Sequence, residues 1–183
     1  FYNQNPEGAV YPTPTIGMVG VLDSLDDKMT LGFKAEGDLI YLLGQSNNDI
    51  NCSEYLHKIC GVEYSPAPHF DLEEEFTVQQ AVLKLISEKL IQSAHDISEG
   101  GLFITLLESG FVAGLGFEAA QEDVSLRADA FWFGESQSRV VVSVSPSKQH
   151  AFETLLAASG TQSVCLGNVK GTDVVINGEN WGA

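Results

Sequence analysis

Two polar clusters in the sequence carry residue types that bind phosphorylated ligands. The first is the run AHDISEGGL at residues 94–102, in which charged and hydroxyl side chains precede a glycine pair. Two helical glycines would cost roughly 1 kcal/mol each relative to alanine, so something other than helix stability favours them. In a strand-to-helix turn, the amides of Gly100 and Gly101 would be able to approach a phosphate. Asp96 would hold Mg²⁺ directly or through water, and Ser98 would cap the helix or donate to the ligand.

The same residues also admit a purely structural interpretation. Asp96 and Ser98 would then be helix caps, and the glycine pair would only allow the helix to pack closely on the strand. Spacing alone favours this packing interpretation, because short glycine pairs are common and the motif on its own is weak.

The second cluster lies in FGESQSR at residues 133–139, immediately before the apolar run VVVSV. The mouth of a strand is a usual place for ligand contacts in α/β architectures. Five polar residues would meet a ligand there, namely Glu135, Ser136, Gln137, Ser138 and Arg139. The alternative is an edge loop in which Arg139 pairs with one of the many carboxylates.

Apolar runs and turn residues divide the chain into alternating strands and helices. The opening residues 1–14 have the composition of a loop. Strands are predicted at 15–22, 38–44, 92–97, 114–119, 139–144, 164–169 and 173–177. Helices are predicted at 52–60, 77–90, 101–112 and 147–158, and Thr77 and Gln80 have the spacing of a capping box. The alternation indicates an α/β layered fold with a mixed sheet packed against helices.

Charge limits the partners of this chain. Its 183 residues include 9 basic and 25 acidic side chains, which give a net charge of −16. Such a surface repels phosphate backbones and anionic headgroups, so nucleic acid and membrane surfaces are not expected partners. An anionic ligand would need local help from backbone amides, the few cations or a bridging Mg²⁺.

Cysteine and histidine spacing give no sign of a disulfide framework or a zinc site. The odd number of cysteines (Cys52, Cys60 and Cys165) fits free, buried thiols in a reducing cytoplasm. The four histidines share no ligand spacing, and no apolar run approaches the ~20 residues of a membrane span. Phosphate-loop and nucleophile-elbow patterns are also absent from the sequence.

Four stretches together carry a family resemblance. They are YPTPTIGMVGVLDS, GDLIYLLG, SAHDISEGGL and FGESQSRVVVSV, in that order along the chain. This combination resembles the large subunit of phosphoribosylformylglycinamidine synthase, in the superfamily of aminoimidazole ribonucleotide synthetase, from about residue 1 to 177. Other superfamily members rank lower, among them aminoimidazole ribonucleotide synthetase itself, selenophosphate synthetase and a hydrogenase maturation factor.

The resemblance implies a ligase of purine biosynthesis. That family converts formylglycinamide ribonucleotide to the formylglycinamidine with ATP, Mg²⁺ and ammonia from a glutaminase component. Its large subunit alternates two A-type and two B-type domains, with the catalytic histidine in an A domain. Residues 1–22 would end an A-type domain and residues 23–183 would form the second B-type domain, with the C-terminal fold of the aminoimidazole ribonucleotide synthetase type. A Gly-Asn-x-Ser stretch is expected upstream of Phe1.

Further expectations follow for this chain as a cytoplasmic fragment of that enzyme. Alone it would be inactive, bind no cofactor tightly, lack its partner A-type and B-type domains, and be prone to artificial dimerisation. The implied site for substrate or an auxiliary nucleotide comprises His95, Asp96, Ser98, Gly100, Gly101, Glu135, Ser136, Gln137 and Arg139. His95 and Asp96 would point into one cleft, Asp96 would be the possible Mg²⁺ ligand, and Ser98 would be the helix N-cap. The competing hypothesis is a non-catalytic module that serves domain contact.

Overall fold

The computed structural model of the chain describes residues 3–10 and 15–183. Its central element is a seven-stranded sheet in the order β4-β6-β3-β7-β5-β8-β9. Neighbouring strands are antiparallel except for the parallel pair β5 and β8. The strands are β3 (Leu39–Leu43), β4 (Ser93–Asp96), β5 (Phe117–Ala119), β6 (Val140–Val144), β7 (Ser163–Val169), β8 (Val174–Ile176) and β9 (Glu179–Asn180). The expected mixed sheet is therefore confirmed.

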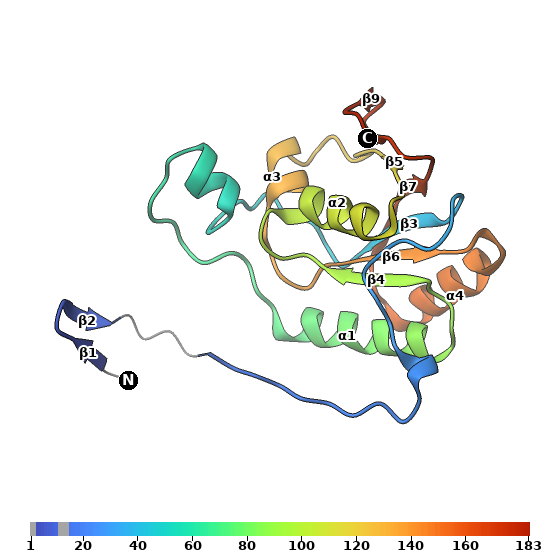
Figure 1. Ribbon diagram of the computed structural model, residues 1–183, viewed down its shortest axis with the longest axis horizontal. Helices are drawn as coiled ribbons and strands as arrows, with labels where there is room; N and C mark the ends of the chain where they lie inside the picture. Colours follow the sequence, from blue (N-terminus) through green and yellow to red (C-terminus); the bar gives the residue numbers. More distant parts are fainter. Residues whose placement is uncertain (1–2, 11–14) are drawn as a thin grey trace.

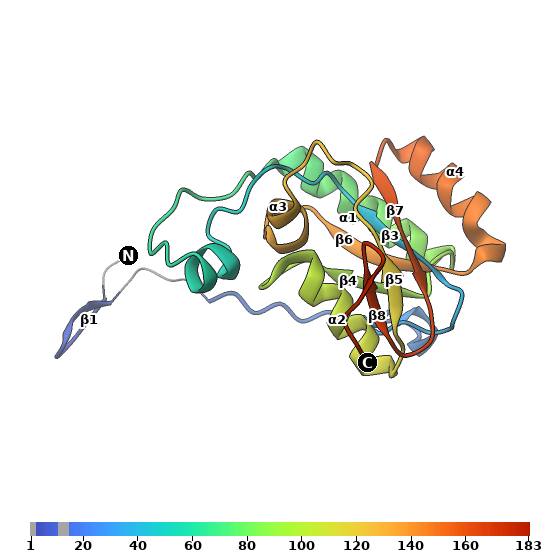
Figure 2. The same cartoon turned by 90° about the horizontal axis from the view of Figure 1, so that it is seen from above.

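Helices cover both faces of this sheet (Figures 1 and 2). They are α1 (Leu72–Ser87), α2 (Gly101–Ala113), α3 (Ala128–Phe133) and α4 (Gln149–Ser159). Helices α1 and α4 pack on one face, and α2 and α3 pack on the other. The predicted helices at 101–112 and 147–158 correspond to α2 and α4, whereas α3 was not predicted.

Alternation along the central strand creates two separate hydrophobic cores. Ile40 and Leu42 of β3 belong to the core beneath α2 and α3, while Tyr41 and Leu43 belong to the core beneath α1 and α4. Successive side chains of a strand point to opposite faces, so a strand that is buried on both faces is apolar at every position. This explains the uninterrupted apolar run LIYLL.

Helix α1 begins earlier than the sequence predicted. Asp71 is its N-cap, and its side chain accepts hydrogen bonds from the amides of Glu73 and Glu74. The predicted capping box at Thr77 is therefore wrong, since the Thr77 hydroxyl donates to the carbonyl of Glu73 inside the helix. An aspartate N-cap followed by three glutamates suits the positive end of the helix dipole, which accounts for the earlier start.

The N-terminal region differs most from expectation. Residues 3–10 form a hairpin of β1 (Asn3–Asn5) and β2 (Gly8–Val10), while the predictions for residues 1–2 and 11–14 fall outside the described residues. The predicted strand at 15–22 is wrong, since these residues run extended, exposed and unpaired along the lower part of Figure 1. A strand needs a ladder partner, and the described part of the chain offers none there.

Smaller differences concern the connections. The helix predicted at 52–60 is one π-helical turn, η2 (Tyr55–Ile59), and two short turns are η1 (Leu25–Asp27) and η3 (Pro146–Lys148). The three cysteines are free as predicted, but all are exposed, so the expectation of burial is wrong. Within residues 3–10 and 15–183, no helix combines the length and apolarity of a membrane span.

Candidate functional site

A cavity of about 500 Å³ lies between α1 and the adjoining ends of β4 and β6, and we call it the α1 groove. One wall is α1, which contributes the apolar side chains of Val78 and Leu83 among others. The other wall is formed by the ends of β4 and β6 and carries Asp96, Gln137 and Arg139. The complete lining is Glu75, Val78, Gln79, Val82, Leu83, Asp96, Ile97, Gln137, Ser138, Arg139 and Val140. The groove thus brings together one predicted site residue of the first cluster, Asp96, and three of the second.

Strand pairing explains why the two clusters meet. Strands β4 and β6 are antiparallel neighbours with Asp96 opposite Val140, so the end of one lies beside the start of the other. The amide of Ile97 extends the ladder by donating to the carbonyl of Arg139 at 3.1 Å. Asp96 and Gln137 therefore flank the same ladder end, although they are far apart in the sequence.

Helix α1 contributes polar groups that the sequence analysis missed. Glu75 and Gln79 lie one turn apart, and the Gln79 amide donates to the Glu75 carboxylate at 2.7 Å. The second Glu75 oxygen accepts from the hydroxyl of Ser138 at 2.7 Å. The available signal was the i, i+4 spacing of Glu75 and Gln79, which puts them on one helix face once the helix starts at Leu72.

Arg139 anchors the backbone beside the α1 groove. It is only 2 % exposed, and its guanidinium donates to the carbonyls of Gly134 at 2.6 Å and Ser136 at 3.2 Å. Burial lowers the pKa of Arg139 to about 10, and the charge of Asp49 acts in the opposite direction. The side chain stays cationic near neutral pH, and it is held by carbonyl oxygens instead of the carboxylate partner of the edge-loop alternative.

His95 points away from the α1 groove. Its Nδ1 lies 3.2 Å from both the Thr105 carbonyl and the Ser109 hydroxyl of α2. Its Nε2 lies 3.4 Å from the carboxylate of Glu108 on the same helix. The expectation that His95 and Asp96 face one cleft is wrong, since neighbouring residues of a strand point to opposite faces of the sheet.

Packing accounts for the glycine pair. Gly100 is the N-cap of α2 with φ 85°, and its amide donates to the Glu135 carboxylate at 2.8 Å. The Gly101 amide donates to the carbonyl of Ser98 at 3.1 Å. A Cβ at Gly101 would lie 2.7 Å from the carbonyl carbon of Phe133 in α3. The prediction of Ser98 as N-cap is wrong, because Gly100 occupies that position and has no side chain with which to cap the helix.

The remaining predicted residues lie outside the α1 groove lining. Ser136 is buried, and Glu135 accepts a second hydrogen bond from the amide of Glu54 at 2.8 Å. Glu54 belongs to residues 45–71, the connection between β3 and α1, which we call the 45–71 loop. In the part of the chain that the structure describes, no group of three or more potential ligands is placed to hold a metal ion.

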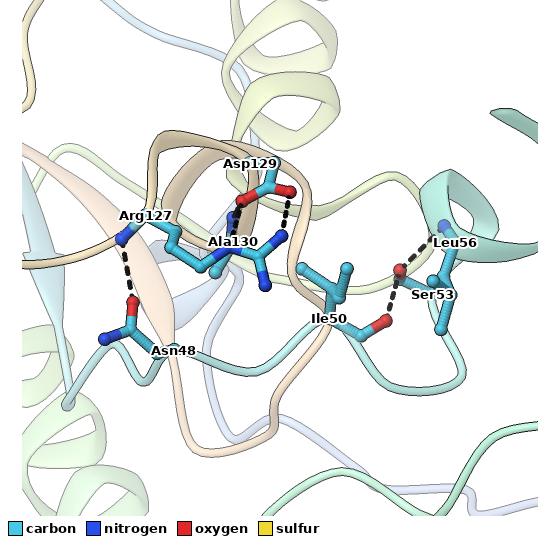
Figure 3. Close-up of polar contacts among 7 residues, drawn as sticks. All are labelled: Asn48, Ile50, Ser53, Leu56, Arg127, Asp129 and Ala130. Carbon is cyan, nitrogen blue, oxygen red and sulfur yellow. Dashed lines mark hydrogen bonds and ion pairs between the residues drawn. The ribbon is translucent and has the colours of Figure 1, made fainter. Parts of the chain in front are cut away.

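Figure 3 shows how the base of the 45–71 loop meets α3. The amide of Arg127 donates to the side chain of Asn48 at 2.7 Å, and the Arg127 guanidinium pairs with Asp129 at 2.5 Å. Ser53 organises the next turn, since its hydroxyl donates to the carbonyl of Ile50 at 2.6 Å. The start of the 45–71 loop is therefore hydrogen-bonded to the start of α3.

A family model described as "AIR synthase related protein, C-terminal domain" matches residues 35–177. The chain belongs to this family. The resemblance stated from the four sequence stretches is thereby confirmed at the level of the superfamily domain.

Individual relatives in this family share a name. The phosphoribosylformylglycinamidine synthase subunit PurL of Caldanaerobacter subterraneus subsp. tengcongensis is 42 % identical over 176 residues, which cover 96 % of this chain and 24 % of the relative. The subunit of the same name from Salinibacter ruber is 45 % identical over 175 residues, covering 92 % of this chain and 23 % of the relative. The chain thus spans about a quarter of the length of these curated relatives.

Solved structures with the same fold are also found. Thermotoga maritima PurL complexed with FGAR superposes with a TM-score of 0.72 at 17 % identity, over 86 % of this chain and 28 % of that one. HypE of E. coli, a hydrogenase maturation protein, superposes with a TM-score of 0.60 at 15 % identity, over 85 % and 52 % of the two chains. At these identities the likeness concerns the fold alone.

Proposed function

We propose that this chain is part of a phosphoribosylformylglycinamidine synthase, the ligase that converts formylglycinamide ribonucleotide to its formylglycinamidine with ATP and glutamine. The observation that carries the proposal is 42 % identity over 96 % of the chain to a relative of that name. Residues 23–183 would be its B-type domain, and residues 1–22 would belong to a preceding A-type domain. Free thiols and the acidic surface suit a cytoplasmic biosynthetic enzyme.

Within that enzyme, the α1 groove would bind the polar part of a substrate or nucleotide. T. maritima PurL structures are described as complexes with FGAR and with ATP. In this chain, Asp96 and Gln137 offer an acceptor and an amide on one wall, and Val78 and Leu83 offer apolar contact on the other. His95, Gly100 and Gly101 would act indirectly, through packing.

Mg²⁺ would fit this arrangement as a bridge to a phosphorylated ligand. Mg²⁺ commonly takes one or two carboxylates and completes its shell with water and phosphate oxygens. Asp96 and Glu75 line the α1 groove and are the carboxylates available to it. The ion would offset the repulsion between a phosphate and a chain of net charge −16.

Exposed apolar side chains support the presence of partner domains, which the isolated chain would lack. Along residues 15–22, Ile16, Met18 and Val19 are 82 %, 93 % and 99 % exposed. On the outer side of α1, Leu72 and Phe76 are 71 % and 61 % exposed. Apolar surface of this extent marks an interaction site, so a chain without its neighbouring domains would tend to self-associate. A glutaminase component would be a further partner, as the family resemblance implies, and one T. maritima structure is described as PurLQS.

The test uses the full-length enzyme with Asp96→Asn and Gln137→Ala. We expect both changes to weaken binding of Mg-ADP or formylglycinamide ribonucleotide by about tenfold, the effect of losing roughly 1.4 kcal/mol of polar contact. Glu99→Gln, at an exposed neighbouring position, is the control. Glutamine-dependent turnover by the 183-residue chain alone would refute the fragment proposal.

The second candidate is a non-catalytic module that serves domain contact. The observation that favours it is the glycine pair, whose amides both have partners inside the domain. If Asp96→Asn and Gln137→Ala leave affinity and turnover of the full enzyme unchanged, this second candidate is the better one. Other superfamily members remain less favoured, because the curated relatives at 42 % and 45 % identity are both named PurL.

A further inference from the structure

The carboxylate of Glu135 joins two backbone segments that are distant in the sequence. Its Oε1 atom accepts hydrogen bonds from the amides of Glu54 and Gly100, each at 2.8 Å. Gly100 opens α2, and Glu54 immediately precedes η2. Bonds from amides to an ionised carboxylate are among the stronger hydrogen bonds in proteins. A single oxygen therefore fixes the start of α2 relative to the 45–71 loop.

Glu135 is itself held on both sides. Arg139 donates to the carbonyl of Gly134 before it and to that of Ser136 after it. Because Arg139 is buried, this stretch of backbone is anchored from inside the domain. Because the backbone on both sides of Glu135 is held in place, the Glu135 carboxylate is positioned to accept from the two amides.

The 45–71 loop is closed at its base by other contacts near Glu135. Asp49 accepts from the amides of Asn51 at 2.9 Å and His69 at 2.7 Å, so it joins the two ends of the loop. The ring of Tyr55 stacks on Phe133 with centroids 5.0 Å apart and planes 9° from parallel. The Glu135–Glu54 bond lies between Asn51 and Tyr55 in the sequence and adds a further tie between the loop and the domain.

Only a few residues along the chain separate Gly100 and Glu135 from residues that line the α1 groove. Asp96 and Ile97 line the groove just before the turn that ends at Gly100. Gln137 lines the groove two residues after Glu135. Glu135 does not line the groove, yet it bonds directly to the turn that follows Asp96 and lies on the loop that carries Gln137.

We propose that Glu135 is a positioning residue and not a ligand contact. Its carboxylate holds the Gly100 turn and the 45–71 loop in the arrangement that presents Asp96 and Gln137 to the α1 groove. The proposal depends on the proposed function only for the identity of the ligand. It replaces the role that sequence resemblance implied for Glu135 with one that rests on its two observed hydrogen bonds.

The first test measures amide hydrogen exchange by NMR in the 183-residue chain. Glu135→Ala removes the acceptor, and we expect exchange at Glu54 and Gly100 to become at least about tenfold faster. Glu135→Gln keeps an oxygen acceptor and should retain most of the protection, with both amide proton resonances shifted upfield by the weaker bond. Glu63→Ala, at an exposed glutamate of the same loop, is the control. Unchanged exchange in Glu135→Ala, or unmoved resonances in Glu135→Gln if the alanine variant does not fold, would overturn the proposal.

The second test measures Mg-ADP affinity in the full-length enzyme by calorimetry. A positioning role predicts that Glu135→Ala weakens binding and that Glu135→Gln restores it to within about twofold of the wild type, since the amide keeps an acceptor. Lost affinity in Glu135→Gln with amide protection intact would mean that the charge touches the ligand, and the proposal would be wrong. Affinity unchanged in Glu135→Ala despite faster exchange would also overturn it. Failure of the wild-type enzyme to bind Mg-ADP would count against the nucleotide ligand alone, because the exchange result is independent of it.

Discussion

His95 and Asp96 are consecutive residues of β4 that serve opposite faces of the sheet. His95 is within 3.2 Å of the Thr105 carbonyl and the Ser109 hydroxyl of α2, whereas Asp96 lines the α1 groove. Sequence adjacency made them look like one constellation, and the two-residue period of the strand separates them. Their substitutions should therefore have different consequences.

His95→Ala should lower stability without affecting ligand binding in the α1 groove. Removing a side chain that is only 11 % exposed and tied to α2 should lower the free energy of unfolding by about 1–2 kcal/mol. Urea unfolding of this variant beside His57→Ala, at an exposed histidine, measures the effect. A loss of Mg-ADP affinity with normal stability would contradict the assignment of His95 to packing.

Gly101→Ala should be strongly destabilising. Gly101 has φ 69°, and its added Cβ would meet backbone atoms of Phe133 at 2.7 Å and Gly134 at 2.8 Å. Backbone strain and the clash together should cost about 2–4 kcal/mol. Gly114→Ala is the matched control, because Gly114 has φ 65° with no atom of the described residues within 4 Å of an added Cβ. It should show the backbone penalty of about 1–2 kcal/mol alone. Equal losses of stability in the two variants would show that α3 can shift to accommodate the added Cβ.

Asp38→Asn should stabilise the protein increasingly as the pH rises. Asp38 is 4 % exposed, its Oδ2 has no hydrogen-bond partner among the described residues, and burial raises its pKa above the ordinary 3.8. An acid with a raised pKa stabilises the fold while protonated, and that contribution is lost as the pH rises through its folded-state pKa. The difference in melting temperature between variant and wild type should therefore be largest near neutral pH and level off below 3.8.

Asp23→Asn, at an exposed aspartate, serves as the control for this titration. A difference for Asp38→Asn that stays constant between acidic and neutral pH would mean that the charge of Asp38 carries no cost in the fold. Any change in stability caused by Asp38→Asn would then have to come from a contact that does not depend on pH.

Val19→Asp should have different effects on the isolated chain and on the intact enzyme. Val19 is 99 % exposed, so the change should alter the free energy of unfolding of the 183-residue chain by less than about 0.5 kcal/mol. It should also reduce self-association of that chain, which sedimentation can measure. In the full-length enzyme the same change should lower the melting temperature, because a charge would enter a buried interface. No loss there would argue against a partner domain over residues 15–22.

Periodicity predicted the core of this fold well. The apolar run LIYLL and the run VVVSV form paired central strands, and the apolar spacing after Gly101 forms α2. These elements are determined by burial, which a hydrophobic pattern records directly. The run at 15–22 carries the same type of pattern, but it lacks a strand to pair with in this chain, so pattern alone gave the wrong answer.

The α1 groove was only half visible in the sequence. Asp96, Gln137 and Arg139 stand in recognisable motifs, whereas Glu75 lies in no motif that the sequence analysis singled out. The partners of Glu135 were beyond sequence reasoning, because the amides of Glu54 and Gly100 are brought together by tertiary structure and not by any spacing.

The order of the strands also governs when this domain can fold on the ribosome. Strand β3 lies at residues 39–43, but both of its neighbours, β6 and β7, lie in the last quarter of the chain. During synthesis β3 therefore has no neighbouring strand to pair with until almost the whole domain has emerged. Its apolar side chains stay exposed until then. Chaperone contact would be most valuable to the nascent chain in that interval.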